Sequence, residues 1–182
     1  MLQFEGVVAT GSAALDSGIG DTALKTFNGT TYLYTVTGPG GGVAVWRLVE
    51  SALPQLVDTE YYSGTITFQV GRSGAPITLA GTEQLVLDVN MAVGLVGYDL
   101  NPDGTLDTLM ETGSLTGGGD ISAIVQVSIG PMDVLAMAHE ETGQIGTYLV
   151  NPDGTLSLAG LVAGSGDAMQ TLRAGTDPFL VS

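Results

Sequence analysis

The stretches VGLVGYDLNPDGTL (Val93–Leu106) and GQIGTYLVNPDGTL (Gly143–Leu156) end in the same six residues, which recur at a spacing of 50. Tyr98 and Tyr148 occupy the same place in the two copies. A more divergent copy, GVAVWRLVESALPQL (42–56), has a tryptophan at this place and a different turn. A sequence that resembles itself at a period of about 50 residues indicates a repeat architecture, in which each repeat is one supersecondary unit.

Each copy lies among other short runs that are rich in Val, Ile, Thr, Tyr and Leu and are bounded by Gly or Pro, as strands are. Two such runs precede it and one follows it. In the second unit these runs are TITFQV (65–70), EQLVLDV (83–89) and TLDTLMETG (105–113). Four strands in a period of about 50 residues are the signature of a β-propeller blade. The sequence therefore predicts an all-β fold, a β-propeller of four-stranded antiparallel blades.

The repeats divide the chain into the blades of one β-propeller domain over residues 1–182. We expect three blades and part of a fourth, at 11–62, 63–115, 116–163 and 164–182. Residues 2–10 resemble the last strand of the third unit, so we expect them to be an outer strand that closes the last blade. About three and a half blades leave two open sheet edges, which invite pairing. We therefore expect the rest of the propeller in the same chain or in a second copy.

The charge of the chain restricts its partners. It has 4 Lys and Arg residues against 19 Asp and Glu residues, for a formal net charge of −15. Nucleic-acid binding depends on Lys and Arg to neutralise phosphates, so nucleic acid is not an expected partner. No apolar run is long enough for a membrane span, and the absence of cysteine excludes disulfides and thiolate metal sites.

A Gly-Asp pair stands directly before three of the expected innermost strands. The three aspartates are Asp21, Asp120 and Asp167. In a propeller these junctions lie on one face, around the mouth of the central channel. Converging carboxylates suit a hard cation, so the aspartates are a candidate metal site with Ca²⁺ as the candidate cofactor. The simpler alternative is that each aspartate accepts hydrogen bonds from nearby backbone amides and fixes a tight turn.

The remaining candidates for chemistry have simpler structural explanations. The stretch DLNPDGTLDTLME (99–111) has nearly the register of a calcium-binding loop, but the second copy lacks two of its acidic positions, which favours a hairpin turn. His139, the only histidine, is expected at the surface at the end of a strand instead of acting as a general base. Blade packing explains Trp46, Tyr98 and Tyr148 better than a sugar-stacking stripe does. No catalytic residue is assigned.

The strings GVAVWRLV, GLVGYDLNPDGTL and IGTYLVNPDGTL, with the opening FEGVVATGSAALDSGIGD, resemble two groups of propellers. They are similar to the seven-bladed lactonase-like (YVTN-type) propellers. They look closer to the N-terminal propellers of bacterial haemolysin-type (RTX) calcium-binding proteins. The resemblance implies that the blades belong to a ring of seven.

The same resemblance implies a function in one of two classes. One is a non-catalytic binding or scaffold module of a secreted haemolysin-type protein, with a protein or carbohydrate ligand and an extracellular location. The other is a lactonase-like hydrolase of the 6-phosphogluconolactonase type, although four dispersed cations make a phosphate pocket hard to build. Residues 1–10 show no secretory leader, and haemolysin-type proteins resemble those exported by a C-terminal signal. We expect the binding module, with the enzyme as the alternative.

Overall fold

The computed structural model describes an almost purely β protein with one short helix, α1 (Ala13–Asp16). Within the described part of the chain, no helix is long and apolar enough to cross a membrane. The described residues are 6–38, 40–62, 70–79, 81–89, 94–107, 110–114, 121–129, 132–139, 142–153, 155–164, 170–174 and 177–181.

The described strands form three four-stranded antiparallel sheets and a hairpin, and within each sheet the strands pair in chain order. The first sheet contains β1 (Ile19–Phe27), β2 (Thr30–Thr37), β3 (Gly42–Arg47) and β4 (Gln55–Tyr61). The second contains β5 (Val70–Leu79), β6 (Thr82–Val89), β7 (Gly94–Asp99) and β8 (Met110–Ser114). The third contains β9 (Ile121–Ile129), β10 (Met132–His139), β11 (Gln144–Val150) and β12 (Leu156–Ala163). The hairpin contains β13 (Gln170–Ala174) and β14 (Asp177–Val181).

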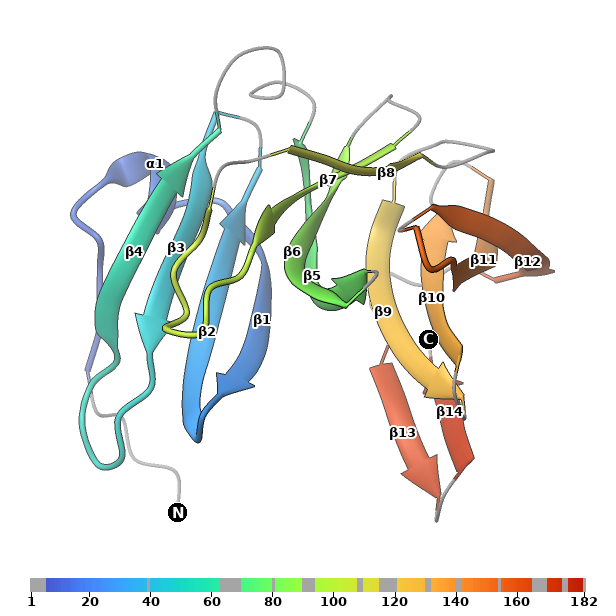
Figure 1. The fold of residues 1–182 in the computed structure, drawn as a ribbon. Helices are drawn as coiled ribbons and strands as arrows, with labels where there is room; N and C mark the ends of the chain where they lie inside the picture. The colour runs from blue at the N-terminus through green and yellow to red at the C-terminus, as the bar shows by residue number, and fades with distance from the viewer. Residues whose placement is uncertain are drawn as a thin grey trace.

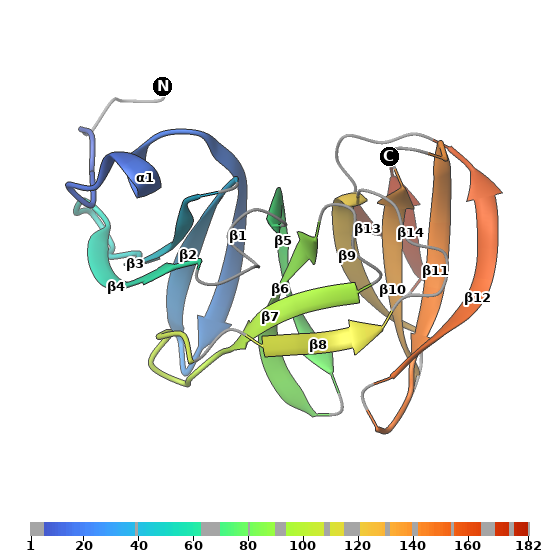
Figure 2. The ribbon, with the colours of Figure 1, turned by 90° about the horizontal axis from the view of Figure 1, so that it is seen from above.

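The three sheets stand side by side as blades (Figure 1), and the first strands of neighbouring sheets, β1 with β5 and β5 with β9, lie against each other (Figure 2). The predicted all-β propeller fold, with three full blades and part of another, is confirmed. Each sheet falls within one of the expected blade ranges. Residues 6–10 of the expected closing strand belong to no strand in this structure, and closure of the ring and its size stay predictions.

The innermost strand of the second blade differs from its prediction. It was expected at 65–70, of which 65–69 lie outside the described residues. The described strand β5 runs from Val70 to Leu79, and its part beyond Val70 was not predicted. The segment VGRSGAPITL resembles a loop because it contains two glycines and a proline. Gly74 is required there, because a Cβ atom at this position would lie 2.8 Å from Cγ2 of Val36 in the first blade. The glycine thus serves a close approach of two blades.

The described hydrophobic core contains three clusters: the two larger ones lie in the interfaces between blades, and a smaller one, which includes Ala136 and Ile145, lies in blade three. In the first, Tyr34 and Val45 of blade one pack with Leu85 and Tyr98 of blade two. In the second, residues of blade two such as Ile77 pack with residues of blade three. Side chains alternate along a strand, so one sheet supplies both interface clusters from its two faces. Each large apolar side chain buried in this way stabilises the fold by about 1.5–3 kcal/mol.

The first NPDGTL turn is a packing element between blades one and two. Gly104 N donates to Asn101 O (2.9 Å) and closes the turn, and Gly104 has a positive φ of 84°. The hydroxyl of Tyr34 donates to Gly104 O (3.1 Å), and the amide of Leu106 donates to Oδ2 of Asp58 (2.9 Å). Both partners belong to the first blade. The predicted hairpin turn is confirmed, and the motif recurs because each copy of it belongs to one blade.

The three aromatic residues at equivalent positions are buried in the blades. Their exposed fractions are 6% for Trp46, 1% for Tyr98 and 2% for Tyr148. Trp46 alternates with Val45, which faces the second blade, and therefore faces away from it. Helix α1 packs against β2 and β3, and its Leu15 is buried. These aromatics stabilise blade packing, as predicted, and offer no stacking stripe.

Polar side chains also connect neighbouring blades. Lys25 of β1 forms an ion pair with Glu83 of β6. The side-chain amide of Gln126 on β9 accepts from Thr78 N (2.8 Å) and donates to Thr78 O (3.1 Å) on β5. These two hydrogen bonds resemble those between adjacent strands of a sheet. They fix the position of β9 in blade three relative to β5 in blade two.

Candidate functional site

The inner strands begin on one side of the molecule. Asp21 near the start of β1 contacts Ser73 and Gly74 in the first half of β5, whereas Thr78 near the end of β5 pairs with Gln126 in the second half of β9. The strands therefore run in the same direction, and their starts gather at one end. We call this end the mouth.

Of the three predicted aspartates, Asp21 is the one among the described residues, and donors from two blades hold its carboxylate. The amide of Thr22 donates to Oδ1 of Asp21 (2.7 Å). Oδ2 of Asp21 accepts from Gly74 N (3.0 Å) and from the hydroxyl of Ser73 (3.3 Å). The side chain is half-buried. Asp21 thus bonds backbone amides, as the simpler alternative expects, but one amide belongs to the next blade. Its carboxylate connects two blades instead of only closing its own turn.

The other two aspartates of the predicted metal site, Asp120 and Asp167, lie outside the described residues. The described residues contain no group of three or more His, Cys, Asp or Glu side chains that could hold a metal ion. The calcium site therefore stays a prediction. A position next to Asp120 is described, because Ile121 begins β9 at the mouth and pairs with His139.

His139 was predicted at the surface, and this prediction is wrong. Only 3% of the residue is exposed. Its Nε2 forms a hydrogen bond of 2.9 Å with the hydroxyl of Tyr148, and its Nδ1 has no partner among the described residues. Burial lowers the pKa of His139 and raises the pKa of the Tyr148 hydroxyl, because both charged forms lose hydration. Gly146 leaves the space for this pair, since a Cβ there would lie 2.7 Å from the Tyr148 ring.

A signal for this burial was present in the sequence. In MDVLAMAH, Leu135 and Met137 alternate on one face of the strand, and His139 is the next residue on that face. Leu135 and Met137 belong to the interface between blades two and three. Because that interface continues to the end of the strand, the histidine is buried with it.

Comparison with known proteins gives likeness in fold alone. No protein-family model matches the chain, and no curated protein sequence matches it. Among solved structures, an endo-arabinase from Bacteroides thetaiotaomicron superposes with a TM-score of 0.61 at 12% identity, over 96% of this chain and 78% of that one. An exo-β-1,3-galactanase from Phanerochaete chrysosporium, solved with β-1,3-galactotriose, gives 0.62 at 12% identity over 90% and 42%. The xyloglucan PUL protein GH43B of Bacteroides ovatus gives 0.52 at 17% identity over 76% and 28%.

These structures are glycoside hydrolases with five-bladed propellers. The chain spans only 28% and 42% of the length of two of them. At these identities the comparison establishes the propeller fold.

The expected function, a non-catalytic module of a haemolysin-type protein with a lactonase as the alternative, is wrong, because the structures that share the fold are neither scaffolds nor lactonases. The resemblance rested on an aromatic strand followed by NPDGTL. In the structure that motif packs blade against blade, through Gly104 and Tyr34. Such packing is needed in any propeller and does not distinguish one family from another.

Proposed function

We propose that this protein hydrolyses glycosidic bonds of a neutral polysaccharide, with its active site at the mouth. The observation that carries the proposal is Asp21, a carboxylate held at the mouth by two blades, in a fold shared with glycoside hydrolases. Donors to both carboxylate oxygens keep the group in one orientation, as a reacting group requires.

Hydrolysis of a glycosidic bond requires two carboxyl groups, one on each side of the bond. One protonates the leaving oxygen, and the other attacks the sugar or activates water. We assign the second role to Asp21, because it is fixed by three donors. The acid would come from Asp120 or Asp167, which the sequence places at the equivalent junctions of later blades. A separation of about 5–5.5 Å from Asp21 would make the reaction retaining, and about 6.5–9.5 Å inverting.

The charge of the protein supports a neutral substrate. A formal net charge of −15 repels polyanions such as uronate polymers, and the chain has only 4 Lys and Arg residues to oppose this. Arabinan, β-1,3-galactan and xyloglucan, suggested by the names of the similar structures, are therefore the first polymers to test. An extracellular location fits a polymeric substrate and remains part of the proposal.

The test is the release of reducing ends from these three polymers by the protein and by single Asp→Asn variants. We expect Asp21→Asn, and either Asp120→Asn or Asp167→Asn, to lose activity about 100-fold or more. Asp153→Asn removes the same charge from an exposed turn and should keep full activity. A thermal unfolding curve for each variant separates loss of chemistry from loss of fold. The proposal is wrong if none of the polymers is cleaved, or if folded Asp21→Asn is as active as the parent.

A further inference from the structure

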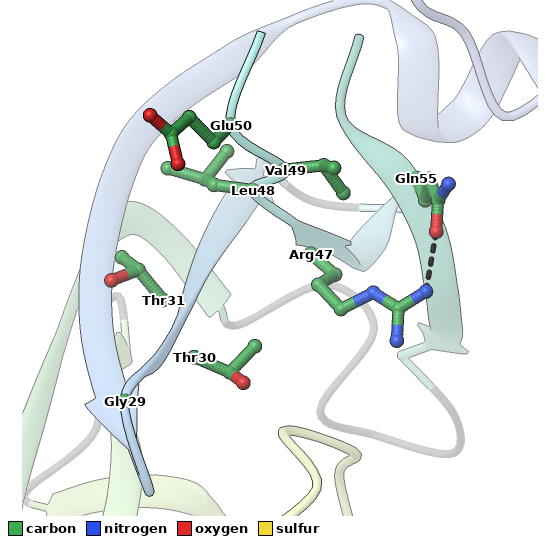
Figure 3. A pocket seen from close by; sticks show the side chains of 8 residues that line it. All are labelled: Gly29, Thr30, Thr31, Arg47, Leu48, Val49, Glu50 and Gln55. Atoms are coloured by element: carbon green, nitrogen blue, oxygen red, sulfur yellow. Dashed lines mark hydrogen bonds between the residues drawn. The ribbon is translucent and has the colours of Figure 1, made fainter. Parts of the chain in front are cut away.

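Blade one contains an open surface pocket, called the cavity below, at the end opposite the mouth. It has a volume of about 640 Å³, within the range of about 300–1,000 Å³ of small-molecule sites. The start of β2 forms one wall with Thr30 and Thr31, and the chain after β3 forms another with Leu48 and Glu50 (Figure 3). Strand β1 rises about 3.3 Å per residue, so about 20 Å of strand separate the cavity from Asp21.

Arg47 is the main hydrogen-bond donor in the cavity. Its Nη2 donates to Oε1 of Gln55, which holds the guanidinium across the wall (Figure 3). A guanidinium has five N–H donors, and this bond uses one of them. Among the described residues Arg47 forms no ion pair, although the chain carries 19 acidic residues. Because Arg47 is exposed, oriented by Gln55 and without an ion pair to another described residue, its remaining donors are available for a ligand.

The opposite charge is present in the same cavity but apart from Arg47. Glu50 lines the cavity and makes no hydrogen bond or ion pair with the described residues, and its side chain lies away from the guanidinium (Figure 3). The charges of Arg47 and Glu50 cancel, so the cavity offers both donors and acceptors without net charge. Leu48 and Val49 add apolar surface between them.

These features fit a neutral sugar better than an anion. Sugar hydroxyls donate to a carboxylate and accept from a guanidinium, and the C–H face of the ring can lie on aliphatic side chains. An anion would gain from Arg47 but would be repelled by Glu50 and by the net charge of the whole protein. We propose that this cavity is a second, non-catalytic binding site for a neutral saccharide, which rests on the proposed function for its ligand class. It would hold a polysaccharide chain to the enzyme at a distance from the reacting bond.

The experiment follows backbone amides by ¹⁵N NMR while oligosaccharides are added. The probes are arabino-, β-1,3-galacto- and xyloglucan oligosaccharides, with oligogalacturonate as the anionic comparison. We expect at least one neutral probe to shift the amides of Thr30, Thr31, Leu48 and Glu50 in a saturable way, and oligogalacturonate to leave them in place. Uniform movement of these amides by the anion alone would overturn the choice of ligand.

Variants of the cavity test the role of Arg47. Charge-assisted hydrogen bonds contribute about 1.5–3 kcal/mol, so Arg47→Ala should weaken binding at the cavity about tenfold or more. Arg47→Lys keeps the charge but loses the planar set of N–H donors of the guanidinium, and should also weaken binding several-fold. Arg173→Ala removes the same charge from β13, which is not part of blade one, and should not change the affinity. Equal affinities for Arg47→Ala and the parent would overturn the inference.

Hydrolysis measured on the same samples separates the two proposals. If the protein cleaves a polymer but no oligosaccharide shifts the cavity amides, the second site is wrong and the proposed function stands. If the cavity binds in an Arg47-dependent way but nothing is cleaved, the proposed function is wrong and the binding site stands. A well-dispersed spectrum for each variant shows that it is folded.

Discussion

Gly104 explains at the scale of one residue why the first NPDGTL turn contains glycine. Its φ of 84° disfavours other residues, and a Cβ atom there would collide with the ring of Tyr32 in the neighbouring blade. We expect Gly104→Ala to lower the free energy of unfolding by about 3 kcal/mol, from backbone strain and overpacking together. Urea denaturation of both proteins measures the difference.

Gly81 provides a matched control for this prediction. It has the same φ of 84°, but a Cβ atom there would have no atom within 4 Å. Gly81→Ala should therefore lower the free energy of unfolding by only about 1 kcal/mol, from backbone strain alone. If the two substitutions lower it equally, contact between the turn and Tyr32 contributes nothing.

His139 makes stability depend on pH at the scale of a single side chain. Burial lowers its pKa in the folded state, whereas the unfolded chain has an ordinary value of about 6.5. As the pH falls below 6.5, His139 binds a proton in the unfolded state but not in the folded state, so the free energy of unfolding decreases. The slope can reach about 1.4 kcal/mol per pH unit until the folded pKa is reached.

Denaturation curves between pH 7.5 and 5.5 test this expectation, because His139 is the only histidine and few other side chains titrate in that window. His139→Gln should abolish most of the slope. A parent protein whose stability does not change over this window would show that the histidine is accessible to protons in the folded state.

Gln126 shows how an element is held in place between blades. Its amide both donates to and accepts from the backbone of Thr78. Gln126→Glu has the same shape but replaces the donor by an acceptor, which would face the Thr78 carbonyl. We expect it to lower the free energy of unfolding by about 1–3 kcal/mol at pH 7, the cost of an unsatisfied polar group. Gln55→Glu, on an exposed residue of the first blade, is the control and should change stability little.

Strands could be predicted from the sequence wherever they had regular composition. TYLYTVT, MDVLAMA and the aromatic strands were predicted correctly, because Val, Leu and Tyr recur within them. Strand β5 beyond Val70 was missed because Gly74 and Pro76, which suit its packing, also suit a loop. The sequence alone could not show whether Gly74 belongs to a loop or to a closely packed strand, because the contact that requires glycine is with Val36, in another blade.

At the scale of the whole molecule, the repeat specified the fold but not the family. The period of about 50 residues and the core clusters between blades follow from the same alternating strands. The proposed function depends on a few residues at the mouth, and the repeat does not specify them. The Gly-Asp junction identified Asp21 as a candidate, but its donors Ser73 and Gly74 lie in the part of β5 that was missed. Its role as a connection between blades was therefore not predictable.

The most direct test of this account is the release of sugar from arabinan, β-1,3-galactan and xyloglucan, measured for the protein and for Asp21→Asn side by side. The account predicts that at least one neutral polymer is cleaved, and that the folded variant cleaves it about 100-fold more slowly or worse. Cleavage at the same rate by both proteins would place the chemistry elsewhere than at Asp21. If no polymer is cleaved, the propeller fold would stand without the proposed activity.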